Sequence, residues 1–260
     1  MGHSATRQRV VLIGASNLTR GISTVVATTQ RIFPGPLEIF SALGHGRCLT
    51  ISGSVLGRRL PGILDCGLWA ALDREEAREP VALVTDIGND LLFGVSVERV
   101  VAGVVECLDR LLARRCRVTI TALPLGQLER LSPRRFRFFK RLFFPNSRLT
   151  WEHAQASSRE LDAQIAELAK QRQITHILPE NAWYGFDPIH VRRRHWRAAW
   201  QSYTGPWRAV DRAPELVRGS LARWLYLRSL APEVRWLCGI EQRRAQPAGR
   251  LADGTTIALY

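Results

Sequence analysis

Short β-branched segments alternate with longer helical segments along most of this chain. Segments with strand character recur at residues 9–13, 37–42, 81–86, 118–123 and 174–178. Each is almost continuously apolar, which is typical of a strand buried on both faces. Helical patterns long enough for right-handed crossovers lie at residues 19–32, 62–78, 97–114, 151–173 and 191–203. The alternation predicts an α/β protein whose helices cover both faces of a five-stranded parallel sheet, a three-layer α/β/α arrangement.

The chain is rich in arginine and strongly basic. Its 260 residues, enough for one large domain, include 37 Lys and Arg against 23 Asp and Glu, a formal net charge of +14. Only Lys140 and Lys170 are lysines. Arginine suits phosphates, carboxylates and anionic surfaces, but net charge acts on solubility and non-specific association before it acts on a specific function. We therefore expect no specific nucleic-acid binding and leave peripheral contact with an anionic membrane open.

The cysteines, histidines and glycines argue against disulfides, metals and nucleotide cofactors. The cysteines are scattered and form no Cys-x-x-Cys pair: Cys48, Cys66, Cys107, Cys116 and Cys238. This usage is typical of a reducing compartment, and the apolar residues 10–13 are too few for a signal peptide, so we expect a cytoplasmic protein. His190 and His195 are five apart, on different faces of a helix, and residues 44–46 lack the third glycine of a dinucleotide fingerprint. Neither a metal nor a cofactor is expected.

Residues that suit catalysis follow the ends of four predicted strands. Ser16 follows the first strand, residues 44–46 (Gly-His-Gly) the second and Asn89 the third. Asp187 and His190 follow the fifth. Each feature also has a purely structural interpretation, as a helix cap, a tight turn or a surface histidine. Because the carboxyl ends of parallel strands meet at one sheet edge, their order favours a common site.

A serine, an imidazole and a carboxylate suit nucleophilic catalysis. Asp187, three residues before His190, can hold one ring nitrogen protonated and leave the other to accept the proton of Ser16. The Asn89 amide and backbone N–H groups of the glycine-rich turn can donate hydrogen bonds to an oxyanion. Residues 14–18 lack the second glycine of a Gly-x-Ser-x-Gly elbow, so the α/β-hydrolase version of a serine site is not supported.

This order of residues resembles the SGNH hydrolases, also called GDSL-type esterases, whose four blocks supply Ser, Gly, Asn and His. The resemblance covers about residues 10–190. Residues 14–17 (Gly-Ala-Ser-Asn) resemble the Gly-Asp-Ser block, and residues 187–190 match the Asp-x-x-His block. Residues 88–90 (Gly-Asn-Asp) resemble the end of the Gly-x-Asn-Asp block, with the glycine one position late.

The first and second blocks depart furthest from the family. Ala15 stands where the family has aspartate, which removes a carboxylate beside the nucleophile but no member of the triad. The second block lacks the usual Ser-Gly-Asp ending. Counted from the strand, Gly46 falls on the glycine whose N–H faces the oxyanion, and Gly44 is the alternate.

The resemblance implies a flavodoxin-like sheet in the order 2-1-3-4-5 and a serine esterase acting on carboxylic esters, with no cofactor. In this assignment Ser16 is the nucleophile, His190 its base and Asp187 the orienting carboxylate. The backbone N–H groups of Ser16 and Gly46 and the side chain of Asn89 hold the oxyanion. The substrate is a small-molecule or lipid ester, and transfer of the acyl group to an acceptor other than water stays open.

An alternative is a catalytically idle protein of the same fold that binds anionic membrane surfaces or nucleic acid through its arginines.

Residues 1–204 are predicted to form the hydrolase-like domain, and residues 205–260 a C-terminal appendage with a helix at 214–230 and a β-hairpin. Residues 126–149 form an insertion in which 133–145 has an amphipathic pattern. We expect a mobile flap beside the acyl pocket, and the alternative is a helix docked on the core.

Overall fold

The computed structural model describes residues 7–74, 79–144, 147–209 and 215–260. Within these ranges its centre is a seven-stranded sheet in the order β10-β11-β2-β1-β5-β6-β7. Neighbouring strands run parallel except the pair β10 and β11. The strands are β1 (Gln8–Ile13), β2 (Leu37–Ala42), β5 (Val81–Val84), β6 (Arg117–Thr121), β7 (Thr175–Ile177), β10 (Gly249–Arg250) and β11 (Thr256–Leu259).

The predicted strands are all present, and they lie in the 2-1-3-4-5 order that the resemblance implies. The expected number of five strands is wrong, because β11 extends the sheet beyond β2 and β10 follows it. In β11, Thr256 lies opposite Glu38 and Leu259 opposite Ser41. The β-hairpin predicted in the C-terminal appendage is therefore part of the central sheet.

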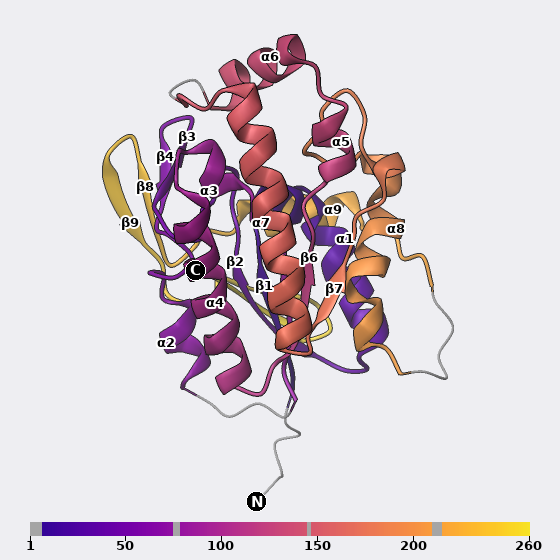
Figure 1. Ribbon diagram of the computed structural model, residues 1–260. Coiled ribbons are helices and arrows are strands. Elements are labelled where there is room, and N and C mark those ends of the chain that lie inside the picture. The colour runs from indigo at the N-terminus through magenta and orange to yellow at the C-terminus, as the bar shows by residue number, and fades with distance from the viewer. Residues whose placement is uncertain (1–6, 75–78, 145–146, 210–214) are drawn as a thin grey trace, which may run out of the picture.

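Helices cover both faces of the sheet, as Figure 1 shows, and confirm the three-layer arrangement. Val10 and Leu12 of β1 pack with residues of α1 (Ser16–Ile32), α8 (Trp196–Thr204) and α9 (Leu221–Ser229). Val11 and Ile13, which point the other way, pack with α2 (Leu68–Leu72), α4 (Val97–Ala113) and α7 (Trp151–Gln171). This alternation gives the sheet one apolar core on each face.

Some helices are shorter than the sequence pattern predicts. The helix expected at 62–78 is reduced to α2, and residues 75–78 lie outside the described ones. α8 begins at Trp196 because Arg193–His195 forms a 3₁₀ turn, η2. α9 begins at Leu221, where the side chain of Ser220 caps the helix, and residue 214 of the predicted helix is not described. Two further 3₁₀ turns are η1 (Asn181–Trp183) and η3 (Gly205–Trp207).

A second, antiparallel sheet was not predicted. Its order is β3-β4-β8-β9, with strands β3 (Gly53–Val55), β4 (Arg58–Leu60), β8 (Val234–Leu237) and β9 (Ile240–Arg243). β4 pairs with β8, so the loop that follows β2 is joined to the C-terminal part of the chain.

Three short helices lie toward the carboxyl edge of the central sheet: α3 (Asn89–Leu92), α5 (Leu125–Glu129) and α6 (Pro133–Phe143) (Figure 1). α6 confirms the helix predicted inside residues 133–145, of which 145 lies outside the described residues. In the described part of the chain, no helix has the length and apolar character needed to cross a membrane.

Candidate active site

Ser16 is the first residue of α1, just after the turn that ends β1, and it is 9% exposed. The N-cap position belongs to Ala15, whose side chain makes no cap bond. The cap comes instead from the Asp86 carboxylate, which accepts the backbone N–H of Ala15 at 2.9 Å and of Asn17 at 3.0 Å. The hydroxyl of Ser16 is therefore not a cap and faces His190.

His190 lies in the loop after β7 and joins Ser16 to Asp187. Its Nε2 is 2.9 Å from Ser16 Oγ, and its Nδ1 is 2.6 Å from Asp187 Oδ2. The second oxygen of Asp187 accepts the backbone N–H groups of Ile189 at 3.1 Å and of His190 at 3.2 Å. The sequence spacing thus places a serine, an imidazole and a carboxylate in one hydrogen-bonded series.

The electrostatics of Asp187 determine which ring nitrogen of His190 carries the proton. Burial acts to raise the pKa of Asp187, but hydrogen bonds from His190 and Ile189 outweigh burial and hold this pKa below its usual value. Nη1 of Arg20 lies 4.0 Å from the same carboxylate. An ionised Asp187 accepts a hydrogen bond only, so Nδ1 of His190 is protonated and Nε2 is the acceptor for the Ser16 hydroxyl.

Asn17 connects the nucleophile turn to the histidine loop. Its Nδ2 donates to Asp86 Oδ1 at 2.9 Å and to the carbonyl of Ile189 at 2.8 Å. Its Oδ1 accepts the backbone N–H of Val191 at 2.8 Å. The residues on either side of His190 are therefore held against the first turn of α1, which fixes the imidazole relative to Ser16.

Sequence reasoning missed Asp86 and Asn17. The available signal was Ala15: a chain that lacks the carboxylate beside its nucleophile must satisfy the first N–H groups of α1 from elsewhere. Asp86 follows β5, which neighbours β1, and it has a φ of +60°, a left-handed conformation that aspartate tolerates better than most residues. In this conformation, the carboxylate of Asp86 contacts the N–H groups at the N-terminus of α1.

Asn89 and the loop after β2 are joined by several hydrogen bonds. Asn89 Nδ2 donates to the carbonyl of Arg47 at 3.1 Å. The buried carboxylate of Asp90 accepts the backbone N–H of Leu49 at 2.8 Å and of Thr50 at 2.9 Å. These contacts hold the second and third sequence blocks together at the sheet edge.

The two glycines of the loop are needed for different reasons. Gly46 has a φ of +66°, which favours glycine. A Cβ at Gly44 would lie 2.3 Å from the Leu60 side chain, so a larger residue there would have to displace that buried leucine. Gly46 directly precedes Arg47, whose carbonyl binds Asn89, and is thus nearer along the chain to the Asn89 contact than Gly44 is.

An apolar pocket of about 100 Å³ lies beside Ser16. The ends of β5 and β6 and the helices α3, α5, α6 and α7 surround it. Its lining includes Leu92, Leu123, Leu131, Phe136, Leu149 and Trp151. The site therefore combines a polar series with an apolar cavity on the α7 side of the sheet.

The helix α6 is docked over this pocket. Phe136 and Phe139 are buried in a small apolar cluster, whereas Phe138 and Leu142 are 54% and 59% exposed. The apolar arc predicted from the sequence is therefore only partly buried. The ring of Phe143 lies edge-on to that of His190, with 5.5 Å between centroids, so α6 contacts the triad directly.

The sequence matches no protein-family model and no curated protein. Solved structures do share its fold. A carbohydrate acetylesterase family member from Sinorhizobium meliloti has a TM-score of 0.53 at 15% identity, over 76% of this chain and 96% of that one. The aryl esterase of M. smegmatis has a TM-score of 0.50 at 14% identity, over 73% and 93%. The chain therefore shares the three-layer α/β/α fold of these two esterases, with the strand order 2-1-3-4-5 that the four sequence blocks imply.

Proposed function

We propose that this chain is a serine ester hydrolase that cleaves carboxylic esters through an acyl-enzyme on Ser16. The observation that carries the proposal is the hydrogen-bonded series of Ser16, His190 and Asp187 beside an apolar pocket. The esterases that share the fold support the same reaction class.

In the first half of the reaction, Ser16 Oγ bonds to the ester carbonyl carbon while His190 Nε2 takes the hydroxyl proton. The electron pair of the C=O bond moves to the carbonyl oxygen. When the tetrahedral intermediate collapses, the bond to the alcohol oxygen breaks, and His190 gives its proton to the departing alkoxide. Asp187 stabilises the imidazolium that exists between these two transfers.

The oxyanion needs donors that are already in place. The backbone N–H groups of Ser16 and Gly46 and the side-chain amide of Asn89 fill this role in our proposal. Asn89 donates a hydrogen bond to the carbonyl of Arg47, the residue after Gly46, so this contact links the two donors. Donors fixed before the reaction stabilise the developing charge without reorganisation.

Water completes the turnover in the second half. His190 Nε2 accepts a proton from water as its oxygen bonds to the acyl carbon, and Ser16 leaves with that proton. The apolar pocket beside Ser16 suits the acyl part of the ester, because its lining offers hydrocarbon contact rather than charge.

We also propose that α6 contacts an anionic lipid surface in which the ester substrate is presented. Phe138 and Leu142 form an exposed apolar edge, and Arg134, Arg137 and Arg141 of the same helix are exposed. An apolar edge flanked by arginines suits acyl chains and anionic head groups.

Covalent labelling by a fluorophosphonate probe is the direct test. The wild-type chain should react and Ser16→Ala should not. Ser158→Ala is the matched control, because Ser158 lines the same pocket but does not bond to His190, and it should label like the wild type. Absence of label on the folded wild-type chain would contradict the proposal and favour the idle binding protein.

Steady-state kinetics on a short-chain aryl ester tests the individual roles. Ser16→Ala and His190→Ala should each lower kcat by roughly a thousandfold or more without unfolding the chain, because the first removes the nucleophile and the second removes its base. Asn89→Ala should cost on the order of 10²- to 10³-fold, as for one oxyanion donor. His195→Ala, at a partly exposed histidine that does not bond to the triad, should retain full turnover. Near wild-type turnover in His190→Ala would rule out this base.

A further inference from the structure

Three cationic or imidazole side chains gather at the edge of the site. Arg58 lies on β4, Arg228 on α9 and His45 in the loop between β2 and β3. Nη1 of Arg228 is 2.8 Å from Nε2 of His45. If Gly44 carried a Cβ, that atom would lie 3.7 Å from Nη2 of Arg58. The Arg58 guanidinium therefore borders the loop that carries His45. We call Arg58, Arg228 and His45 the cationic cluster.

Among the described residues, no carboxylate forms an ion pair with the two arginines of this cluster. Burial lowers the pKa of Arg58, and repulsion from Arg228 and Arg235 lowers it further. Arg58 is partly buried and Arg228 is exposed, and an anion that binds between two guanidinium groups relieves their mutual repulsion.

His45 adds a neutral donor to the cluster. Burial, followed by the charges of Arg228 and Arg58, lowers the pKa of His45 to about 4, so its imidazole is uncharged at neutral pH. Nε2 accepts the hydrogen bond from Arg228, which leaves the proton on Nδ1. The cluster therefore offers two guanidinium groups and one imidazole N–H.

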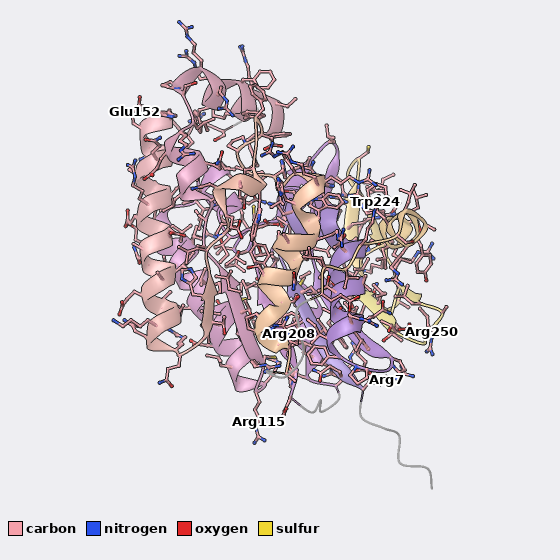
Figure 2. All side chains as sticks on the ribbon, turned by 90° about the vertical axis from the view of Figure 1, so that its right-hand side faces the viewer. Arg7, Arg115, Glu152, Arg208, Trp224 and Arg250 are labelled. Atoms are coloured by element: carbon pink, nitrogen blue, oxygen red, sulfur yellow. The ribbon has the colours of Figure 1, made fainter. Side chains whose placement is uncertain are left out.

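The cluster lies beside the triad, away from the apolar pocket. Arg20, whose Nη1 lies 4.0 Å from the Asp187 carboxylate, is one of the charges that lower the pKa of His45. Trp224 of α9 donates to the carbonyl of Arg20, and its ring lies 5.3 Å from the Arg228 guanidinium. Figure 2 shows Trp224 on the side of the molecule opposite Glu152 of α7, the helix that borders the pocket.

We propose that the cationic cluster binds an anionic group, a carboxylate or a phosphate, on the alcohol part of a small soluble ester. The inference rests on the proposed esterase function of the same site. The apolar pocket takes the acyl part, so the alcohol part extends toward Arg58, Arg228 and His45. Guanidinium groups bind either anion through paired hydrogen bonds, which are stronger than those between neutral groups.

Matched aryl esters test this assignment. The probes are the butyryl esters of 4-hydroxybenzoate, 4-hydroxyphenyl phosphate and 4-hydroxybenzamide, which differ in the charge of the leaving group. The measurement is the ratio of kcat/KM for each anionic ester to that for the neutral amide. In Arg58→Gln and Arg228→Gln this ratio should fall by about tenfold to a hundredfold, as expected for a lost hydrogen bond to a charged group.

Arg59→Gln is the matched control. Arg59 is the next residue on β4, is exposed and lies over the Trp236 ring, so the substitution removes the same charge without touching the cluster. It should leave the ratio within about twofold, since an exposed charge that lies over Trp236 rather than in the cluster is screened by salt. Arg58→Lys keeps the charge but loses the paired geometry, and its ratio should fall between those of the wild type and Arg58→Gln.

Equal losses on the anionic and neutral esters would overturn the anion site and assign a structural role to these arginines. A loss confined to esters in anionic vesicles would also overturn it, in favour of lipid head groups. If the wild type hydrolyses none of the esters, the proposed function fails instead. In that case, calorimetry measures whether 4-hydroxybenzoate and phenyl phosphate bind to the Ser16→Ala chain. Binding supports the anion site, and absence of binding refutes it.

Discussion

At the scale of single residues, Asp86 shows how this chain compensates for Ala15. The Asp86 carboxylate accepts N–H groups of Ala15 and Asn17 at the start of α1, together with the side-chain amide of Asn17. It therefore fixes the turn that presents Ser16. Ala15 offers no side-chain acceptor at the N-cap, and the carboxylate of Asp86, just after β5, supplies one.

Replacing Asp86 with asparagine tests this positioning role. Asparagine also tolerates a left-handed backbone, but its NH₂ group faces donors where the carboxylate had an acceptor. We expect a loss of about 1 to 3 kcal/mol in the free energy of unfolding. A misplaced Ser16 should also lower kcat by about tenfold or more. Urea unfolding and aryl ester kinetics measure both effects.

The control is Asp109→Asn, which removes a carboxylate from an exposed ion pair with Arg172 and should change both quantities little. Wild-type stability and kcat in Asp86→Asn would contradict the role.

Positioning residues such as Asp86 are hard to predict because their partners are distant in sequence. Asp187 and His190 share one loop, so their spacing alone predicts the pair, whereas Asp86 acts on amides 71 and 69 positions away.

At the scale of elements, burial explains which strands the sequence predicts. β1 and β5 are buried along nearly their whole length, and continuous apolar runs indicate such strands. β9 is exposed throughout, and β4 begins with two arginines, so neither has an apolar pattern. Their pairing depends on contacts between distant parts of the chain, and this second sheet contributes Arg58 to the cationic cluster.

The amphipathic pattern of α6 does not tell which of its phenylalanines are buried, whereas the structure does. Phe139 is 8% exposed within an apolar cluster, whereas its neighbour Phe138 is 54% exposed. Phe139→Ser should lower the melting temperature and reduce activity on soluble and vesicle-presented esters alike, since loss of a buried phenylalanine costs about 3 kcal/mol or more. Phe138→Ser should keep the melting temperature and reduce activity on vesicle-presented esters only.

Thermal unfolding and paired assays on a soluble acetate ester and a long-chain ester in anionic vesicles provide these measurements. Equal activity losses on both esters in Phe138→Ser would contradict the lipid contact and leave α6 as a docked helix alone. The mobile flap expected from the sequence stays a prediction. The burial of Phe136 and Phe139 indicates that any opening must first break their cluster.

At the scale of the whole molecule, the C-terminal residues belong to the central sheet. β11 pairs with β2 in parallel, and Ile257 and Leu259 belong to the apolar core that also contains Val10 and Leu12 of β1. The sequence predicts residues 205–260 as an appendage rather than a second domain. The contacts of β11 support a stronger proposal, that this segment unfolds together with residues 1–204.

Ile257→Ala tests the proposal. Ile257 is 1% exposed and pairs with Ile39 of β2, so the substitution leaves a cavity between the C-terminal strand and the main core. We expect a loss of about 2 to 4 kcal/mol and one calorimetric transition, shifted as a whole to lower temperature. Ile240→Ala, the same change at a 69% exposed position on β9, should leave the transition in place. A second transition that alone responds to Ile257→Ala would show instead that residues 205–260 unfold separately. The loss of one buried side chain shifts the unfolding of the entire sheet only if the sheet unfolds as one cooperative unit.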